Sequence, residues 1–161
     1  MQKIMPCLWF DDQAEEAVDF YVSVFSNSKI GTVTRYGEAA AEATGRPEGS
    51  VMVIFFQLEG QDFMALNGGP AFTFSPAISL VANCRTQEEV DELWEKLSEG
   101  GTTQQCGWLQ DKYGVSWQIV PTILGELLQD EDTEKSEAVM RAMLQMGKID
   151  IEGLQQAYAQ R

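Results

Sequence analysis

The sequence contains no histidine among its 161 residues. Histidine is the commonest general base in enzymes and a frequent ligand of transition metals, and it activates the nucleophile in Ser-His-Asp and Cys-His systems. Its absence excludes those nucleophile systems and removes the usual ligand of a catalytic zinc site. Any acid–base chemistry would have to use Asp, Glu, Tyr or Cys.

Basic residues are scarce, with 11 Lys and Arg against 25 Asp and Glu, so the formal net charge is −14. Nucleic acids and anionic membranes are bound through basic surfaces, so neither is expected as a partner. The chain has only three cysteines, Cys7, Cys84 and Cys106. An odd number in apolar segments predicts buried thiols rather than a disulfide framework.

Long apolar runs are also missing. No segment approaches the roughly 20 apolar residues of a membrane span, and residues 1–6 lack the apolar core of a secretory signal. The expected compartment is therefore the cytoplasm. The 44% hydrophobic and 22% charged content is typical of a soluble globular protein, and the length fits one domain or one domain of two similar halves.

The first half of the chain predicts one helix among four strands. Asp12, with Glu15 three places on, has the capping-box pattern and begins a helix predicted over residues 12–25, with Ala17 and Tyr21 on its apolar face. The small, polar segment 37–50 is expected to be a mobile loop or an irregular excursion. Strands are predicted at residues 4–10, 29–36, 51–58 and 63–66.

The same order is repeated in the second half. Thr86 begins a second capping box, and Val90 and Leu97 belong to the apolar stripe of a helix over residues 86–98. Strands are predicted at residues 77–84, 102–109 and 115–120. The two capping residues are 86 − 12 = 74 positions apart. The sequence thus predicts an α+β fold of two tandem βαβββ modules, residues 1–70 and 76–121, within one domain over residues 1–121.

The composition changes after Pro121 to helix-forming residues, which predicts a C-terminal helical extension over residues 122–161. Its helices are expected at residues 123–128 and 133–146 and after Asp150. Ile151, Leu154 and Tyr158 form an apolar stripe on the last helix. Because an exposed stripe of this kind would promote aggregation, we expect it to be buried in a homodimer interface.

Residues 104–121 predict a β-hairpin. Gly114 can adopt the positive φ that closes a tight turn, and Asp111 can accept hydrogen bonds within it. In the strand after the turn, Gln118 points to the face opposite Trp117 and Ile119. A buried amide needs partners, and a bound molecule is one way to supply them.

Several of these segments together resemble the PhnB-like branch of the vicinal oxygen chelate superfamily, which includes glyoxalase I, extradiol dioxygenases and bleomycin-resistance proteins. Members of the branch are often labelled 3-demethylubiquinone-9 3-methyltransferase. The resemblance extends over most of the chain, with the C-terminal helices included, and implies paired βαβββ modules that form a cup, usually in a homodimer. The segments are Glu15-Glu16-Ala17, Phe20-Tyr21, Ala65-Leu66-Asn67-Gly68-Gly69-Pro70, Cys106-Gly107-Trp108-Leu109 and Asp111-Lys112-Tyr113-Gly114-Val115-Ser116-Trp117-Gln118-Ile119.

The metalloenzymes of that superfamily hold a metal with four ligands from the first and last strands of each module. By position, the last-strand carboxylate corresponds to Gln118, and the other ligands correspond to residues 4–6, 65–67 and 77–79. None of these three segments contains a carboxylate or an imidazole. Because Gln118 is neutral, we expect no bound metal and no other cofactor.

These observations favour a metal-free small-molecule-binding protein. The alternative is an enzyme of the same superfamily, with methyl transfer or with lyase, isomerase or dioxygenase chemistry; a third possibility is an interaction protein whose dimer is its purpose. No G-x-G motif follows a strand, since Gly68-Gly69 and Gly100-Gly101 lie at a module joint and a helix end, so S-adenosylmethionine is not expected to bind. The ligand would be a small organic molecule, and its binding residues are expected to be Asn67, Ser79, Gln105, Trp108 and Gln118.

Overall fold

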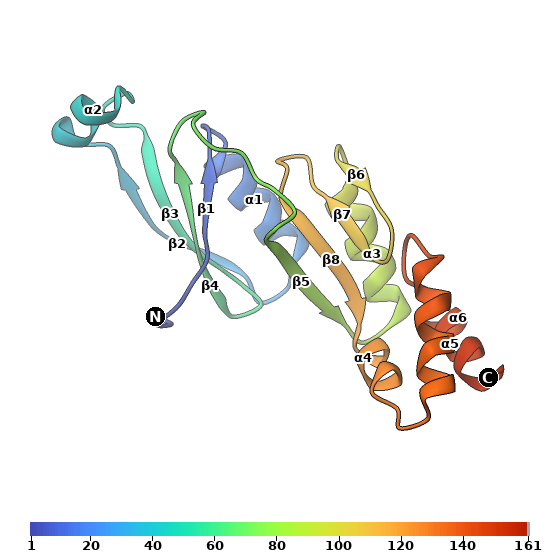
Figure 1. Cartoon of the computed structure of the whole chain (residues 1–161). Coiled ribbons are helices and arrows are strands. Elements are labelled where there is room, and N and C mark those ends of the chain that lie inside the picture. The colour runs from blue at the N-terminus through green and yellow to red at the C-terminus, as the bar shows by residue number, and fades with distance from the viewer. Residues whose placement is uncertain (161) are drawn as a thin grey trace. The chain divides into compact units, whose positions relative to one another are not determined.

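The computed structural model describes residues 1–160, which form two compact units, Met1–Phe74 and a second beginning at Ser75. Figure 1 shows a sheet and helices in each unit. The predicted α+β architecture is confirmed, because each unit contains a four-stranded mixed sheet with a helix after its first strand. The C-terminal helices belong to the second unit.

The first unit has the sheet order β1-β4-β3-β2. Its first strand pairs parallel with its last, and the other pairs are antiparallel. Helix α1 packs on one face through Ala14, Ala17, Val18 and Tyr21, which are at most 1% exposed. The elements are β1 (Cys7–Phe10), α1 (Ala14–Val24), β2 (Lys29–Arg35), α2 (Glu38–Thr44), β3 (Val51–Leu58) and β4 (Gln61–Asn67).

The second unit has the equivalent order β5-β8-β7-β6, again with its first and last strands parallel. Helix α3 packs on one face of this sheet through Val90 and Leu97, both fully buried. The elements are β5 (Ser79–Cys84), α3 (Gln87–Ser98), β6 (Thr102–Thr103), β7 (Trp108–Gln110), β8 (Ser116–Pro121), α4 (Thr122–Leu128), α5 (Thr133–Leu144) and α6 (Ile151–Gln160).

Two predictions about the first unit are wrong. Asp12 does not cap helix α1: Gln13 occupies the N-cap position without a side-chain bond, and Asn67 at the end of β4 accepts the Ala14 N–H at 2.8 Å. The segment predicted as a loop contains helix α2, because it is rich in alanine and Gly45 ends the helix with a φ of 76°.

In the second unit, the Thr86 cap is confirmed, since its hydroxyl accepts the Glu89 N–H at 3.1 Å. The continuous strand predicted over residues 102–109 is wrong. Cys106 and Gly107 have φ values of 59° and 83°, two consecutive residues outside the β region, so β6 and β7 are separate. The backbone N–H groups of Cys106 and Gly107 donate to the carbonyl oxygens of Met146 and Gly147. These two bonds attach the C-terminal helices to the sheet.

The apolar stripe of the last helix packs within its own unit, with Leu154 buried and Ile151 and Tyr158 partly buried. Leu154 is fully buried beside Leu124, Val139 and Ile149, and Tyr158 packs against this cluster. Gln87 of α3 accepts the Ile151 N–H at 2.8 Å and donates to the Ile149 carbonyl at 3.1 Å. The stripe therefore gives no reason to expect a dimer interface at this helix. Within residues 1–160, no helix has the length and apolar character to cross a membrane.

Candidate functional site

Each sheet has one face covered by a helix and an opposite face, which we call the open face. Burial alternates along β8 from Trp117 onward: Trp117 and Ile119 are at most 3% exposed, whereas Gln118 between them is partly exposed. Gln118 therefore lies on the open face, as the hairpin predicted.

The turn of the hairpin holds β8 in this register. The Asp111 carboxylate is 3% exposed and accepts the backbone N–H groups of Tyr113 and Val115 at 2.9 and 3.0 Å. Its second oxygen accepts the Trp117 indole N–H at 2.9 Å. Gly114 has the expected positive φ, 92°. These bonds confirm the predicted role of Asp111 in the turn and fix which residues of β8 face the helix.

Three polar residues come together on the open face of the second sheet, and we call Ser79, Ser116 and Gln118 the Gln118 cluster. Ser79 of β5 is the register partner of Ser116, and Gln118 lies two residues further along β8. The Gln118 Nε2 donates to the Ser79 Oγ at 2.9 Å. The structure thus joins two of the predicted site residues directly.

Ser116 is the member of the cluster that sequence reasoning missed. It is 1% exposed, and its hydroxyl has no hydrogen-bond partner among the described residues. A buried hydroxyl without a partner costs free energy, so such a group is unusual unless a water or ligand completes it. Its alternation with Gln118 was a usable signal, but nothing in the sequence indicated that its hydroxyl would be unbonded.

Trp108 lies beside the cluster, because it is the register partner of Gln118 on β7 and its side chain is half-buried. Gln105 lies in the exposed loop before β7, where its carbonyl accepts the Trp108 N–H at 3.1 Å. Within residues 1–160, no hydrogen bond joins the Gln105 side chain to Ser79 or Gln118. Trp108 can therefore form a wall of the site, and Gln105 can reach it only from the loop.

Asn67 belongs to the first unit, and its amide is already used there. It is 3% exposed, and its Nδ2 donates to Glu15 Oε1 at 2.6 Å and to the Val51 carbonyl at 3.1 Å, while Oδ1 caps α1. Both of its N–H groups thus have partners in the protein. Only its carbonyl oxygen retains acceptor capacity for a further group.

The cysteine thiols do not provide a nucleophile of the usual kind. Burial raises the pKa of Cys84 to about 11, and a weaker contribution comes from the nearby Glu89 carboxylate. The prediction of buried thiols holds for Cys84 alone, because Cys7 is exposed and Cys106 is half-buried. Partial desolvation nevertheless raises the pKa of the Cys7 thiol. Because the thiolate is the reactive form, both groups are protonated and unreactive near neutral pH.

The residues at the superfamily's metal positions do not fit a divalent cation. Such an ion needs three or more converging ligands, usually with carboxylate, imidazole or thiolate among them. The Gln118 cluster offers only neutral amide and hydroxyl oxygens, and across residues 1–160 no three His, Cys, Asp or Glu side chains lie close enough to hold a metal ion.

The arrangement of paired βαβββ units with helix-covered sheets defines a protein of the vicinal oxygen chelate superfamily. Residues 2–120 match the family model described as 3-demethylubiquinone-9 3-methyltransferase. The chain therefore belongs to this family. It has no significant match among proteins of curated function.

Solved structures agree with this assignment. A PhnB protein of Bacillus cereus, described as a 3-demethylubiquinone-9 3-methyltransferase, is 40% identical with a TM-score of 0.67 over 75% of this chain and 100% of its own. A protein of Pseudomonas aeruginosa is 20% identical with a TM-score of 0.60, over 75% of this chain and 98% of its own. The fosfomycin resistance protein FosX of Listeria monocytogenes shares the fold at 15% identity, with a TM-score of 0.56 over 80% of this chain and 98% of its own.

These matches correct the predicted extent of the resemblance. The family model ends at residue 120, and the Bacillus cereus protein is covered completely by 75% of this chain. Helices α4, α5 and α6 begin after that limit. The family model therefore does not cover the C-terminal helices.

Proposed function

We propose that this protein is a cytoplasmic, metal-free binding protein for a small organic molecule, which binds on the open face of the second sheet. The observation that carries the proposal is the Ser116 hydroxyl, 1% exposed and without a hydrogen-bond partner among the described residues. A ligand atom that accepts from or donates to this hydroxyl would remove the cost of leaving it unbonded.

The other residues of the site supply complementary contacts. Gln118 uses one amide N–H on Ser79, so its carbonyl oxygen and second N–H can bind the ligand. Trp108, opposite Gln118 on β7, provides an aromatic surface. Asn67 and Gln105 have smaller parts in this proposal, since Asn67 has only acceptor capacity left and Gln105 lies in an exposed loop. The ligand would be a neutral or weakly polar molecule.

A screen of small molecules for an increase in melting temperature tests this function. A compound that binds only the native state raises the melting temperature by mass action. Hits on the wild-type protein should lose their effect on Gln118→Leu and keep it on Gln104→Leu, which changes an exposed glutamine of the same unit. If no compound stabilises the protein, or if Gln118→Leu responds as the wild type does, the site is wrong.

The second candidate is an enzyme of the superfamily, and the family description favours methyl transfer. Against it, the sequence lacks the G-x-G motif after a strand, which nucleotide-type cofactor sites use. We expect calorimetry to detect no binding of S-adenosylmethionine at sub-millimolar concentration. Tight, stoichiometric binding would replace the first proposal with this one.

We also propose that the protein forms a homodimer, as the resemblance to the superfamily implies. The buried stripe of α6 does not support this proposal, so the interface would have to lie elsewhere. Sedimentation at micromolar concentration decides the question: a monomer of 17.9 kDa would refute it.

A further inference from the structure

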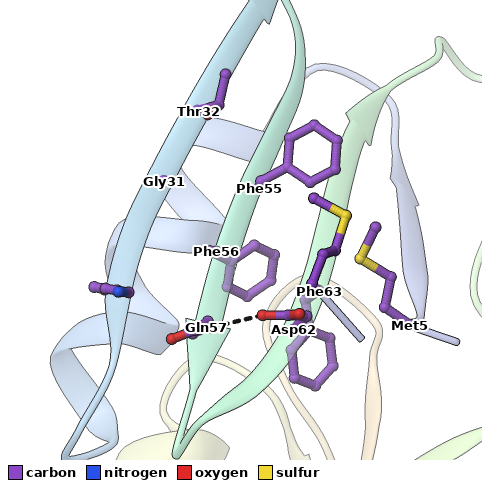
Figure 2. Close-up of a pocket in the computed structure, with 10 residues that line it drawn as sticks. Met5, Gly31, Thr32, Phe55, Phe56, Gln57, Asp62 and Phe63 are labelled. Carbon is purple, nitrogen blue, oxygen red and sulfur yellow. Dashed lines mark hydrogen bonds between the residues drawn. The ribbon is translucent and has the colours of Figure 1, made fainter. Parts of the chain in front are cut away.

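The open face of the first sheet contains a cavity of about 260 Å³ at the β3–β4 hairpin, which we call the Phe55 pocket. It shares no residue with the Gln118 cluster or with the binding residues predicted from the sequence. Figure 2 shows Phe55 and Met5 at its apolar part and the hydrogen-bonded pair Gln57 and Asp62 at its polar part. The pocket lies wholly within the first unit.

Strand register explains this division into a polar and an apolar part. Lys29 of β2 pairs with Gln57 of β3, and Gln57 pairs with Asp62 of β4, so the three form one row across the open face. Phe55 lies two residues along β3, in the next row, about 7 Å away. Neighbouring strands are about 5 Å apart, so the backbones of Lys29 and Asp62 are separated by about 10 Å, with Gln57 between them.

The backbone opens the space beside Phe55. The β2–β3 register shifts between Ile30 and Val33, so Gly31 and Thr32 oppose the single residue Phe55. A Cβ atom at Gly31 would lie 3.1 Å from the Phe55 carbonyl oxygen. Glycine therefore allows the two strands to approach here, and no side chain at residue 31 fills the pocket.

The N-terminal segment closes one side of the pocket and is held by Gln2. The Gln2 backbone N–H donates to Asp62 Oδ2 at 2.8 Å, and its side chain donates to the Gly60 carbonyl at 3.0 Å. The Gln2 Oε1 accepts the Gln61 side-chain N–H at 2.7 Å and the Asp62 N–H at 3.0 Å. These bonds bring Met1 and Met5 to the pocket wall.

The two charges of the polar row, Lys29 and Asp62, border one cavity and do not form a salt bridge with each other. The hydrogen bonds from the Gln2 backbone and then from the Gln57 side chain lower the pKa of Asp62, so its carboxylate is ionised at neutral pH. Among the described residues, Lys29 has no salt bridge within 4.0 Å and no hydrogen bond from its side chain. An ammonium and a carboxylate thus border the same cavity, on either side of Gln57.

From this geometry we propose that the Phe55 pocket binds an α-amino acid with an aromatic or other apolar side chain. Its carboxylate pairs with Lys29, its ammonium with Asp62, and its side chain packs on Phe55 and Met5. A ligand with one charge satisfies only one end of the row and places that charge near the like-charged residue at the other end. The cavity volume suits a molecule of this small size rather than a drug-sized one.

Nuclear magnetic resonance titration of the full chain with three probes tests the proposal. The probes are L-phenylalanine, 2-phenylethylamine, which lacks the carboxylate, and 3-phenylpropanoate, which lacks the ammonium. L-Phenylalanine should give saturable shifts of the Lys29, Phe55 and Gln57 amides, and each single-charge probe should bind about tenfold more weakly. The absence of saturable shifts with L-phenylalanine at concentrations on the order of 10 mM, or equal affinities for the three probes, would overturn the proposal.

Two variants should each remove the preference for L-phenylalanine over one of the single-charge probes. Lys29→Gln should make 2-phenylethylamine bind as well as L-phenylalanine, and Asp62→Asn should do the same for 3-phenylpropanoate. Lys3→Gln, which removes an exposed charge outside the pocket lining, should change nothing. If Lys3→Gln changes the relative affinities of the probes as Lys29→Gln does, the change comes from the net charge of the protein and not from the pocket, and the proposal is wrong. Among the described residues the Lys29 side chain forms no hydrogen bond or salt bridge, so the Lys29→Gln variant decides the matter even if Asp62→Asn fails to fold. If these titrations contradict the amino-acid proposal, the proposed binding of a small molecule at the Gln118 cluster is not affected, because the two sites share no residue.

Discussion

In the first unit, helix α1 is capped by Asn67, a residue 53 positions away on strand β4, whereas in the second unit helix α3 is capped by Thr86 directly before it. The strand order of the two sheets is equivalent. One unit thus uses a long-range contact, and the other a local one, for the same structural requirement. The comparison teaches that equivalent topology does not assign equivalent roles to residues at similar positions.

The open faces differ in the same way. The first sheet presents Phe55 beside the row of Lys29, Gln57 and Asp62, so charged groups border its pocket. On the second sheet, the Gln118 cluster consists of neutral amide and hydroxyl groups. The two units should therefore bind chemically different molecules, even though each sheet has one helix-covered face and one open face.

The largest effect on stability is expected in the second unit, where helices α4, α5 and α6 pack around a common core. Leu154→Ala should lower the free energy of unfolding by about 4 kcal/mol, because Leu154 is fully buried in the cluster of α4, α5 and α6. Leu144→Ala, at a side chain that is 52% exposed, should cost less than about 1 kcal/mol. Urea unfolding gives both values, and hydrogen exchange should show the loss in β5–β8 and not in β1–β4. Equal effects of the two substitutions would contradict this packing.

The two helix caps give the next effect. Asn67→Ala removes three hydrogen bonds of a buried amide and should cost about 3 kcal/mol, whereas Thr86→Ala should cost about 1 kcal/mol. Urea unfolding of the two variants measures the difference. If Thr86→Ala were as damaging as Asn67→Ala, the distinction between a long-range and a local cap would have no energetic basis.

The smallest effect is a dependence on pH that is confined to the second unit. The hydrogen bond from Tyr158 to Asp130, 2.6 Å long, lowers the pKa of Asp130 from 3.8 and raises the pKa of Tyr158 from 10.0. Because the pKa of Asp130 is lowered in the folded state, its carboxylate stabilises the fold above about pH 4, and this contribution is lost on acidification. Because the pKa of Tyr158 is raised, its protonated phenol stabilises the fold below about pH 10, and this contribution is lost at higher pH.

Unfolding free energies of the wild type and Tyr158→Phe, measured from pH 3 to 11, test this pair. The difference between the two proteins should be largest between about pH 4 and 10 and should decrease outside that range. A difference that is constant over the whole range would show that the hydrogen bond does not link the two titrations.

The sequence predicted the features that rest on local chemistry. The amphipathic helices, the Thr86 cap and the Asp111 turn each depend on residues close together in the chain, and the structure confirms them. Sequence-based prediction failed where a residue distant in the chain takes the structural role of a local one. Asp12 has a good capping pattern, but Asn67 takes that function from another strand. The α6 stripe predicted a partner surface because its contacts in the same unit were not evident.

The candidate site was predictable only in part. Alternation along β8 placed Gln118 on the open face, and the repeated module suggested which strand would lie beside it, so the Ser79–Gln118 pair was within reach of sequence reasoning. The unbonded hydroxyl of Ser116 was not, since hydrogen-bond satisfaction depends on three-dimensional packing. The Phe55 pocket was also missed, because it requires the β2–β3 register shift and the position of Gln2.

The most direct test of the central claim is the affinity of a hit from the melting screen for the wild type and for Ser116→Ala, measured by calorimetry. Removing an unbonded buried hydroxyl should leave the ligand-free protein as stable as the wild type or more stable by up to about 1 kcal/mol. The same change should weaken ligand binding about tenfold, because the ligand loses its partner. Unchanged affinity, or a variant clearly less stable than the wild type without ligand, would contradict the claim that a ligand completes Ser116.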